Sequence, residues 1–79
     1  MSRGRVLVCD DEMLIRLWLE EHLADRGYAV ESFGDGGSML ASLEREPADL
    51  VLLDLRLPDG SGIDFLTRIK AVAPAMPVI

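Results

Sequence analysis

Short apolar runs that alternate with segments of helical periodicity constrain this chain more than any other feature. After each of the first three runs, apolar residues recur every three or four positions. The strands are expected at 5–9, 28–33, 49–55 and 76–79, and the helices at 12–26, 35–46 and 63–73. Strands that alternate with helices at this spacing pair in parallel through right-handed crossovers. The chain is therefore predicted to form an α/β fold around a parallel sheet.

Aspartates mark the ends of two of these expected strands. Residues 5–9 lead directly into Asp10 and Asp11, and the run 49–55 contains Asp54 near its end. The carboxyl ends of parallel strands lie along one edge of the sheet, and ligands bind at this edge in open α/β folds. If the two strands are neighbours, three carboxylates converge there.

Three clustered carboxylates repel one another, so they must either take up protons or bind a cation. A few oxygen ligands with open positions for water and phosphate suit Mg²⁺ better than Ca²⁺. A carboxylate held beside Mg²⁺ can attack phosphorus and form an aspartyl phosphate. Asp54 ends the most apolar strand and is the expected nucleophile, whereas Asp10 and Asp11 are the expected metal ligands. The simpler alternative is that each aspartate only caps a turn or a helix.

Composition limits the other classes of function. Fourteen Asp and Glu against eight Lys and Arg give a formal net charge of −6, which leaves no basic surface for nucleic acid. The apolar runs are too short to span a membrane, and residues 1–5 are not expected to begin a signal peptide. Cys9, the single cysteine, is expected in the core because it has no disulfide or zinc partner. A cytoplasmic protein that binds neither nucleic acid nor membranes is expected.

Three other features allow a functional and a structural interpretation. The glycine-rich residues 34–37 precede a helix, but they lack a complete GxGxxG pattern, which favours a turn with a helix cap over a dinucleotide site. His22 is expected to be structural or partly exposed. Leu14 and Leu17 widen the apolar stripe of the first helix beyond one face. They either pack at its margin or mark a partner surface.

Two segments together resemble the receiver domain of bacterial two-component response regulators. They are VLVCDDE at residues 6–12 and LVLLDLRLPDGSG at residues 50–62, followed by an expected helix. The resemblance implies a three-layer α/β/α, flavodoxin-like fold with a parallel sheet in the order 2-1-3-4-5. Residues 1–79 would then form the N-terminal two-thirds of this domain. They would lack the end of the fourth strand, the fourth helix, the fifth strand and the fifth helix.

The resemblance also implies roles for individual residues. Asp54 would accept a phosphoryl group from a phosphohistidine on a sensor histidine kinase or a phosphotransfer protein. Asp11 would bind Mg²⁺ directly, and Asp10 directly or through water, while Asp54 and the backbone carbonyl of Arg56 would complete the ligands. The family has a Ser or Thr after its fourth strand and a Lys after its fifth. Neither is expected among these residues, because the sequence stops at Ile79, and Lys70 is no substitute because it lies in the third expected helix.

The expected function is a phosphorylation-switched receiver module, not an enzyme, that regulates an output domain or an effector protein. Control of transcription is the expected output, and a homodimer is a further expected association because edge strands can pair. Two alternatives stay open. One is a receiver-like chain that acts through protein contacts or oligomerisation alone. The other is a Mg²⁺-dependent phosphohydrolase, although such enzymes typically show DxD followed closely by Thr, and residues 54–56 depart from that pattern.

Overall fold

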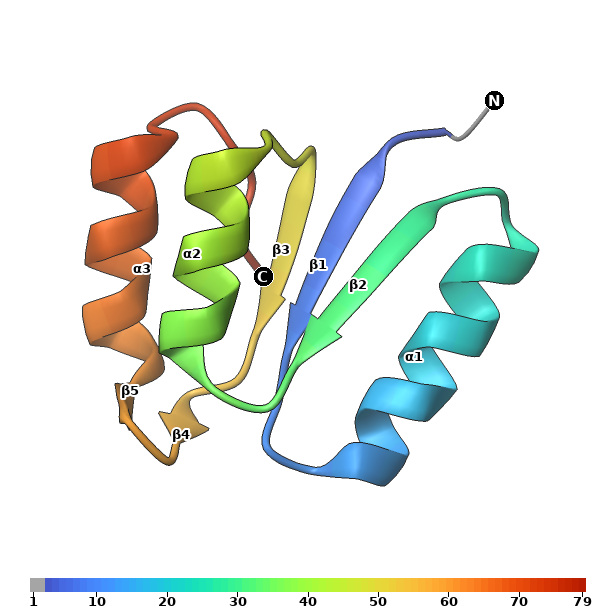
Figure 1. Cartoon of the computed structure of the whole chain (residues 1–79), viewed down its shortest axis with the longest axis horizontal. Coiled ribbons are helices and arrows are strands. Elements are labelled where there is room, and N and C mark those ends of the chain that lie inside the picture. Colours follow the sequence, from blue (N-terminus) through green and yellow to red (C-terminus); the bar gives the residue numbers. More distant parts are fainter. Residues whose placement is uncertain (1–2) are drawn as a thin grey trace.

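Strands and helices alternate along the chain as the sequence pattern indicates. The computed structural model describes residues 3–79. Met1 and Ser2 lie outside the described residues, and they begin the segment that was considered as a signal peptide. The elements are β1 (Arg5–Cys9), α1 (Met13–Asp25), β2 (Ala29–Phe33), α2 (Gly36–Arg45), β3 (Leu50–Leu53), β4 (Arg56–Leu57), β5 (Gly60–Ser61) and α3 (Gly62–Val72). Figure 1 shows their arrangement. Within the described residues, no helix is long and apolar enough to cross a membrane.

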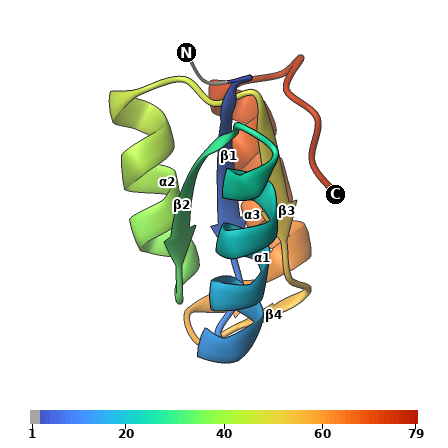
Figure 2. The ribbon, with the colours of Figure 1, turned by 90° about the vertical axis from the view of Figure 1, so that its right-hand side faces the viewer.

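The main sheet is parallel, with the strands in the order β2-β1-β3. The central strand, β1, pairs with both neighbours, so that Leu7 lies between Glu31 and Val51. Helices α2 and α3 cover one face of the sheet and α1 covers the other (Figures 1 and 2). Because β1 is central and covered on both faces, its apolar run is nearly continuous and its residues 6–9 are buried. These observations confirm the predicted three-layer α/β/α architecture.

The larger core lies between the sheet and the pair of helices α2 and α3. One face of β1 and β3 contributes Leu7, Cys9 and Val51, all almost completely buried. The remaining core residues are Met39, Leu40, Leu43, Leu57, Phe65, Ile69 and Met76. In both helices the apolar residues recur on one face, as expected for helices that cover a sheet. The buried position of Cys9 confirms its predicted role as a core residue.

The contacts of α1 with the sheet are weaker than its sequence suggests. None of its residues is buried, and only Leu19 and Leu23 among its leucines are partly covered. Trp18 is 58% exposed and Leu14 is 76% exposed. The first two turns carry apolar residues all around the helix, so the pattern could not indicate which of them face the sheet. The apolar stripe that packs is therefore narrower than the predicted one.

Arg5 joins three elements at the amino end of the sheet. Its guanidinium donates to the Oε1 of Glu31 on β2 (2.9 Å), to the Oγ of Ser42 on α2 (2.6 Å), and to the carbonyl of Glu46 at the end of α2 (2.8 Å). Ser42 is buried, and its hydroxyl donates to Glu31 (2.7 Å). We call these four residues the Arg5 cluster. Because none of its buried side-chain polar atoms lacks a hydrogen-bond partner, it links α2 to the sheet without leaving an unsatisfied group.

Two segments differ from the sequence-based expectation. The expected turn after β3 contains a short antiparallel hairpin, in which Arg56 pairs with Ser61 and Leu57 pairs with Gly60. The expected strand at 76–79 appears as a single parallel bridge between Val51 and Val78 on the outer side of β3. Three hydrogen bonds of 2.8–3.2 Å between residues 51–53 and 77–79 support this bridge. The last residues therefore lie where the sequence pattern predicted them, with less regular pairing.

Candidate functional site

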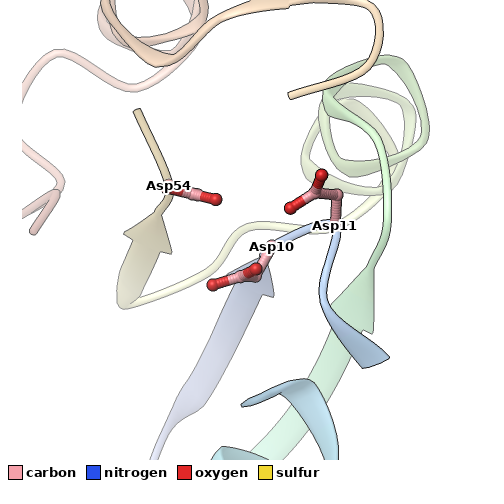
Figure 3. A group of neighbouring side chains, drawn as sticks. All are labelled: Asp10, Asp11 and Asp54. Atoms are coloured by element: carbon pink, nitrogen blue, oxygen red, sulfur yellow. The ribbon is translucent and has the colours of Figure 1, made fainter. Parts of the chain in front are cut away.

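Asp10, Asp11 and Asp54 lie together at the carboxyl edge of the sheet, as Figure 3 shows. One carboxylate oxygen from each residue lies within 4.8 Å of the others. In the figure the side chains of Asp11 and Asp54 point toward one another beyond the ends of β1 and β3. Asp10 and Asp54 are half-buried, and Asp11 is exposed. The convergence expected from the parallel topology is thus present, while the role of each residue stays a prediction.

The backbone fixes the positions of Asp10 and Asp54. The N–H of Asp54 donates to the carbonyl of Cys9 (2.9 Å), which extends the pairing of β3 with β1 up to the site. The N–H of Asp10 likewise donates to the carbonyl of Phe33 (3.0 Å) at the end of β2. Hydrogen bonds of the sheet therefore fix the backbone from which each of these two carboxylates extends.

Helix α1 further constrains Asp10. The Oδ1 of Asp10 accepts the N–H of Glu12 (2.9 Å), as in an Asx turn, and its carbonyl accepts a hydrogen bond from Arg16 (2.7 Å). Glu12 was expected to open the helix, and it occupies the N-cap position without a capping bond from its side chain. The sequence did not indicate the contact of Arg16. One carboxylate oxygen of Asp10 is thus engaged with the turn, and the other is available to a ligand.

The donor set fits a small, hard cation. All three side chains offer carboxylate oxygens, which Mg²⁺ prefers in proteins. Three negative groups within a few ångströms also favour cation binding electrostatically. A cavity of about 190 Å³ borders Asp10 and Asp54 and is otherwise lined mostly by apolar side chains. The position of the Arg56 carbonyl as a further ligand stays a prediction.

Cys9 lies next to the site but is chemically inert there. Burial, with smaller contributions from Asp35 and Asp59, raises the pKa of its thiol to about 12. Its Sγ contacts the carbonyl of Asp35 (3.4 Å). A thiol with so high a pKa stays protonated at neutral pH and is a poor nucleophile or metal ligand.

A close approach holds the start of α3 against the end of β3. The N–H of Gly62 donates to the carbonyl of Leu55 (2.8 Å). A Cβ at position 62 would lie only 2.3 Å from the carbonyl oxygen of Asp54, so only glycine fits this position. Ser61 caps the helix by accepting the N–H of Asp64 (3.2 Å). The loop that follows Asp54 is therefore closed at its base.

The other residues considered from the sequence have structural contacts. Asp35 caps α2 by accepting the N–H of Ser38 (2.8 Å), which confirms the predicted turn with a helix cap. His22 is exposed and stacks on Trp18, with the ring centroids 4.1 Å apart. Lys70 donates to the carbonyl of Met76, at the C-terminal end of α3 and away from the three aspartates.

Comparisons with known proteins agree with this geometry. Residues 6–79 match the response regulator receiver domain family. The DNA-binding transcriptional regulator NtrC of Salmonella typhimurium is 40% identical over 79 residues, which is all of this chain and 17% of NtrC. The crystal structure of a CheY-like response regulator receiver domain protein from Methanospirillum hungatei is 34% identical, with a TM-score of 0.94. That match covers 98% of this chain and 62% of the other.

A second crystal structure, that of NtrX from Brucella abortus in complex with ADP, gives a TM-score of 0.91 at 34% identity. This match covers 99% of the present chain and 18% of NtrX. The chain therefore spans less than a fifth of NtrC and NtrX. The match over residues 6–79, the parallel sheet and the clustered carboxylates lead to the same conclusion: this chain belongs to the response regulator receiver domain family, whose members act as phosphoacceptors in signalling.

Proposed function

We propose that this chain is the phosphoacceptor module of a two-component phosphorelay and that Asp54 is the residue phosphorylated. The observation that carries the proposal is the convergence of Asp10, Asp11 and Asp54 within 4.8 Å at the carboxyl edge of two paired strands. The relatives named as response regulators support it. The module acts as a switch that is itself modified, and not as an enzyme with turnover.

The three aspartates and the carbonyl of Arg56 would hold one Mg²⁺ ion. Bound there, the ion would neutralise charge on the transferred phosphoryl group. Asp11 is exposed and is free to turn toward an arriving ligand, whereas Asp10 is held by Glu12 and Arg16. Asp10 would therefore contribute a fixed ligand oxygen, and Asp11 an adjustable one.

Asp54 would act as the nucleophile. One of its carboxylate oxygens forms a bond to phosphorus while the P–N bond of the phosphohistidine breaks, and the imidazole leaves with the electron pair and takes up a proton. The bond from the Asp54 N–H to Cys9 and the contact with Gly62 hold the backbone of the nucleophile on both sides. Such positioning supplies a large part of the rate in phosphoryl transfer.

The partners follow from the chemistry and from the relatives. The donor would be a sensor histidine kinase or a phosphotransfer protein, because these carry phosphohistidine. The output would be a transcription-regulating domain or an effector protein, by analogy with NtrC, which is named as a DNA-binding transcriptional regulator. The acidic chain itself would not bind nucleic acid, and its place of action would be the cytoplasm. A homodimer remains a prediction.

Phosphorylation by a small donor tests the proposal. The chain is incubated with Mg²⁺ and acetyl phosphate, and intact mass spectrometry follows the phosphoryl adduct. We expect an adduct in the wild type and in Asp25→Asn, which removes an exposed carboxylate at the far end of α1, and none in Asp54→Asn. A folded wild-type chain without adduct would contradict the proposal. Continuous release of phosphate over many turnovers would instead indicate a phosphohydrolase.

A further inference from the structure

The carboxylate of Asp59 connects the hairpin that follows the candidate site to the start of α2. Its Oδ1 accepts the N–H of Gly36 (2.9 Å) and its Oδ2 accepts the N–H of Gly37 (2.8 Å). These are the first two residues of α2, whose N–H groups have no partner inside the helix. Hydrogen bonds from both amides lower the pKa of Asp59, so the carboxylate is ionised at neutral pH. We call this pair of bonds the Asp59 clasp.

The glycines at the start of α2 make the clasp possible. A Cβ at position 36 would lie 2.3 Å from the ring of Phe65, and one at position 37 would lie 3.3 Å from the Oδ2 of Asp59. The segment that the sequence presented as a possible dinucleotide loop therefore does bind an anion with its backbone amides. The anion is a carboxylate of the same chain.

The clasp acts on the part of the chain that carries Arg56. Residues 55–62 form a loop whose base is closed by the bond between Gly62 and Leu55 (2.8 Å). The arms of the loop are β4 and β5, paired from Arg56 to Ser61, and Asp59 lies at its tip. With base and tip both fixed, the peptide of Arg56 has little freedom to rotate.

We propose that Asp59 is a positioning residue for the cation and phosphoryl site, because its clasp fixes the orientation of the loop that carries the Arg56 carbonyl. The inference rests on the proposed function. Without the clasp, the loop would be held by its base and by the pairing of its arms but not at its tip. Binding the cation would then require the tip to be ordered at an entropic cost. Residues that orient metal ligands typically change metal affinity or activity by 10–100-fold.

The test measures the affinity of the 79-residue chain for Mg²⁺ by calorimetry and the rate of adduct formation with acetyl phosphate. Asp59→Asn keeps the shape of the side chain but offers a single acceptor oxygen to the two amides. We expect its dissociation constant for Mg²⁺ to rise by roughly ten-fold and its phosphorylation rate to fall. Asp25→Asn, which makes the same change in charge far from the site, is expected to match the wild type.

A second variant separates positioning from stability. Gly37→Ala adds a methyl group beside the Oδ2 of Asp59 and, in an exposed first turn of a helix, also favours helix formation. We expect weaker Mg²⁺ binding in this variant without a loss of thermal stability, a combination that a merely structural role would not produce.

The outcomes distinguish the inference from the proposed function. Unchanged Mg²⁺ affinity in both Asp59→Asn and Gly37→Ala, with the wild type binding Mg²⁺ and forming the adduct, overturns the role of Asp59 and leaves the proposed function intact. A wild-type chain that binds no Mg²⁺ overturns both. Weaker binding in both variants, with Asp25→Asn unchanged, supports the role of Asp59.

Discussion

Replacing Gly62 by alanine is expected to destabilise the fold and to displace the proposed nucleophile. A Cβ at this position would lie 2.3 Å from the carbonyl oxygen of Asp54 and 2.8 Å from the Cα of Leu55. Both are backbone atoms, so the overlap cannot be relieved by a change of rotamer. The start of α3 or the end of β3 must move instead, and the hydrogen bond between Gly62 and Leu55 is strained or lost.

The size of the effect follows from these contacts. Overpacking costs typically about 1–3 kcal/mol, and the loss of one backbone hydrogen bond adds about 1 kcal/mol. Alanine favours helix over glycine by about 1 kcal/mol in a helix interior, but position 62 is the first residue of α3, where this gain is smaller. The net loss should be about 2 kcal/mol. For a chain of this length the whole stability is on the order of 4–12 kcal/mol.

Urea unfolding followed by circular dichroism measures this loss. With a slope of about 1 kcal/mol per molar, the midpoint should fall by about 2 M at an unchanged slope. Gly37→Ala is the comparison for stability alone: its Cβ would approach only the side chain of Asp59, at 3.3 Å, and not the backbone, and alanine favours the helix, so its midpoint should not fall. A midpoint for Gly62→Ala within about 0.5 M of the wild type would refute the reasoning.

Three further outcomes are expected. Leu7→Ala removes a fully buried side chain of the central strand and should cost about 2–5 kcal/mol in urea unfolding; a loss below about 1 kcal/mol would contradict the assigned core. The pKa of Glu31 is lowered by the hydrogen bond from Ser42 and by Arg5, so its contribution to stability is full above its ordinary pKa of 4.5 and is lost as the pH falls through the lower folded value. In Glu31→Gln the free energy of unfolding should therefore fall less steeply as the pH is lowered, and an equally steep fall in the wild type and the variant would contradict this role of Glu31. Saturating Mg²⁺ at about 100 times its dissociation constant should stabilise the wild type by about 2.7 kcal/mol. Thermal unfolding should show no such stabilisation by Mg²⁺ when Asp10 and Asp11 are both replaced by Asn. An equal stabilisation of this variant would mean that the ion binds elsewhere.

Most of the fold was predictable because the strands are short, apolar and regularly spaced. The nearly continuous run in β1 indicated a strand covered on both faces, and the parallel topology then brought Asp54 beside Asp10 without any knowledge of side-chain geometry. The cap of α2 was also predictable, since Asp35 stands at the correct distance from Ser38. These features depend on local patterns or on one topological rule.

The remaining features depend on contacts that no local pattern encodes. The Asp59 clasp joins residues 22 and 23 positions apart, and its donors are backbone amides, which every sequence contains. The contact of Arg16 with the carbonyl of Asp10 is likewise a bond to the backbone. The exposure of Trp18 could not be inferred because its helix is apolar on several sides. Each was decided by packing between elements that are distant in the sequence.

Helix α2 is held at both ends, by the Arg5 cluster near its C-terminus and by the Asp59 clasp at its first turn. At its C-terminal end the helix is anchored through Ser42 and Glu46, while its first turn is held to the hairpin by the Asp59 clasp. A displacement of the hairpin would therefore tilt the start of α2 about a fulcrum at the amino end of the sheet. Amide hydrogen exchange should follow this division, with slow exchange around Ser42 under all conditions and exchange at Gly36 that changes when Mg²⁺ is added. Equal changes along the whole helix would mean that α2 moves as a rigid rod without a fulcrum.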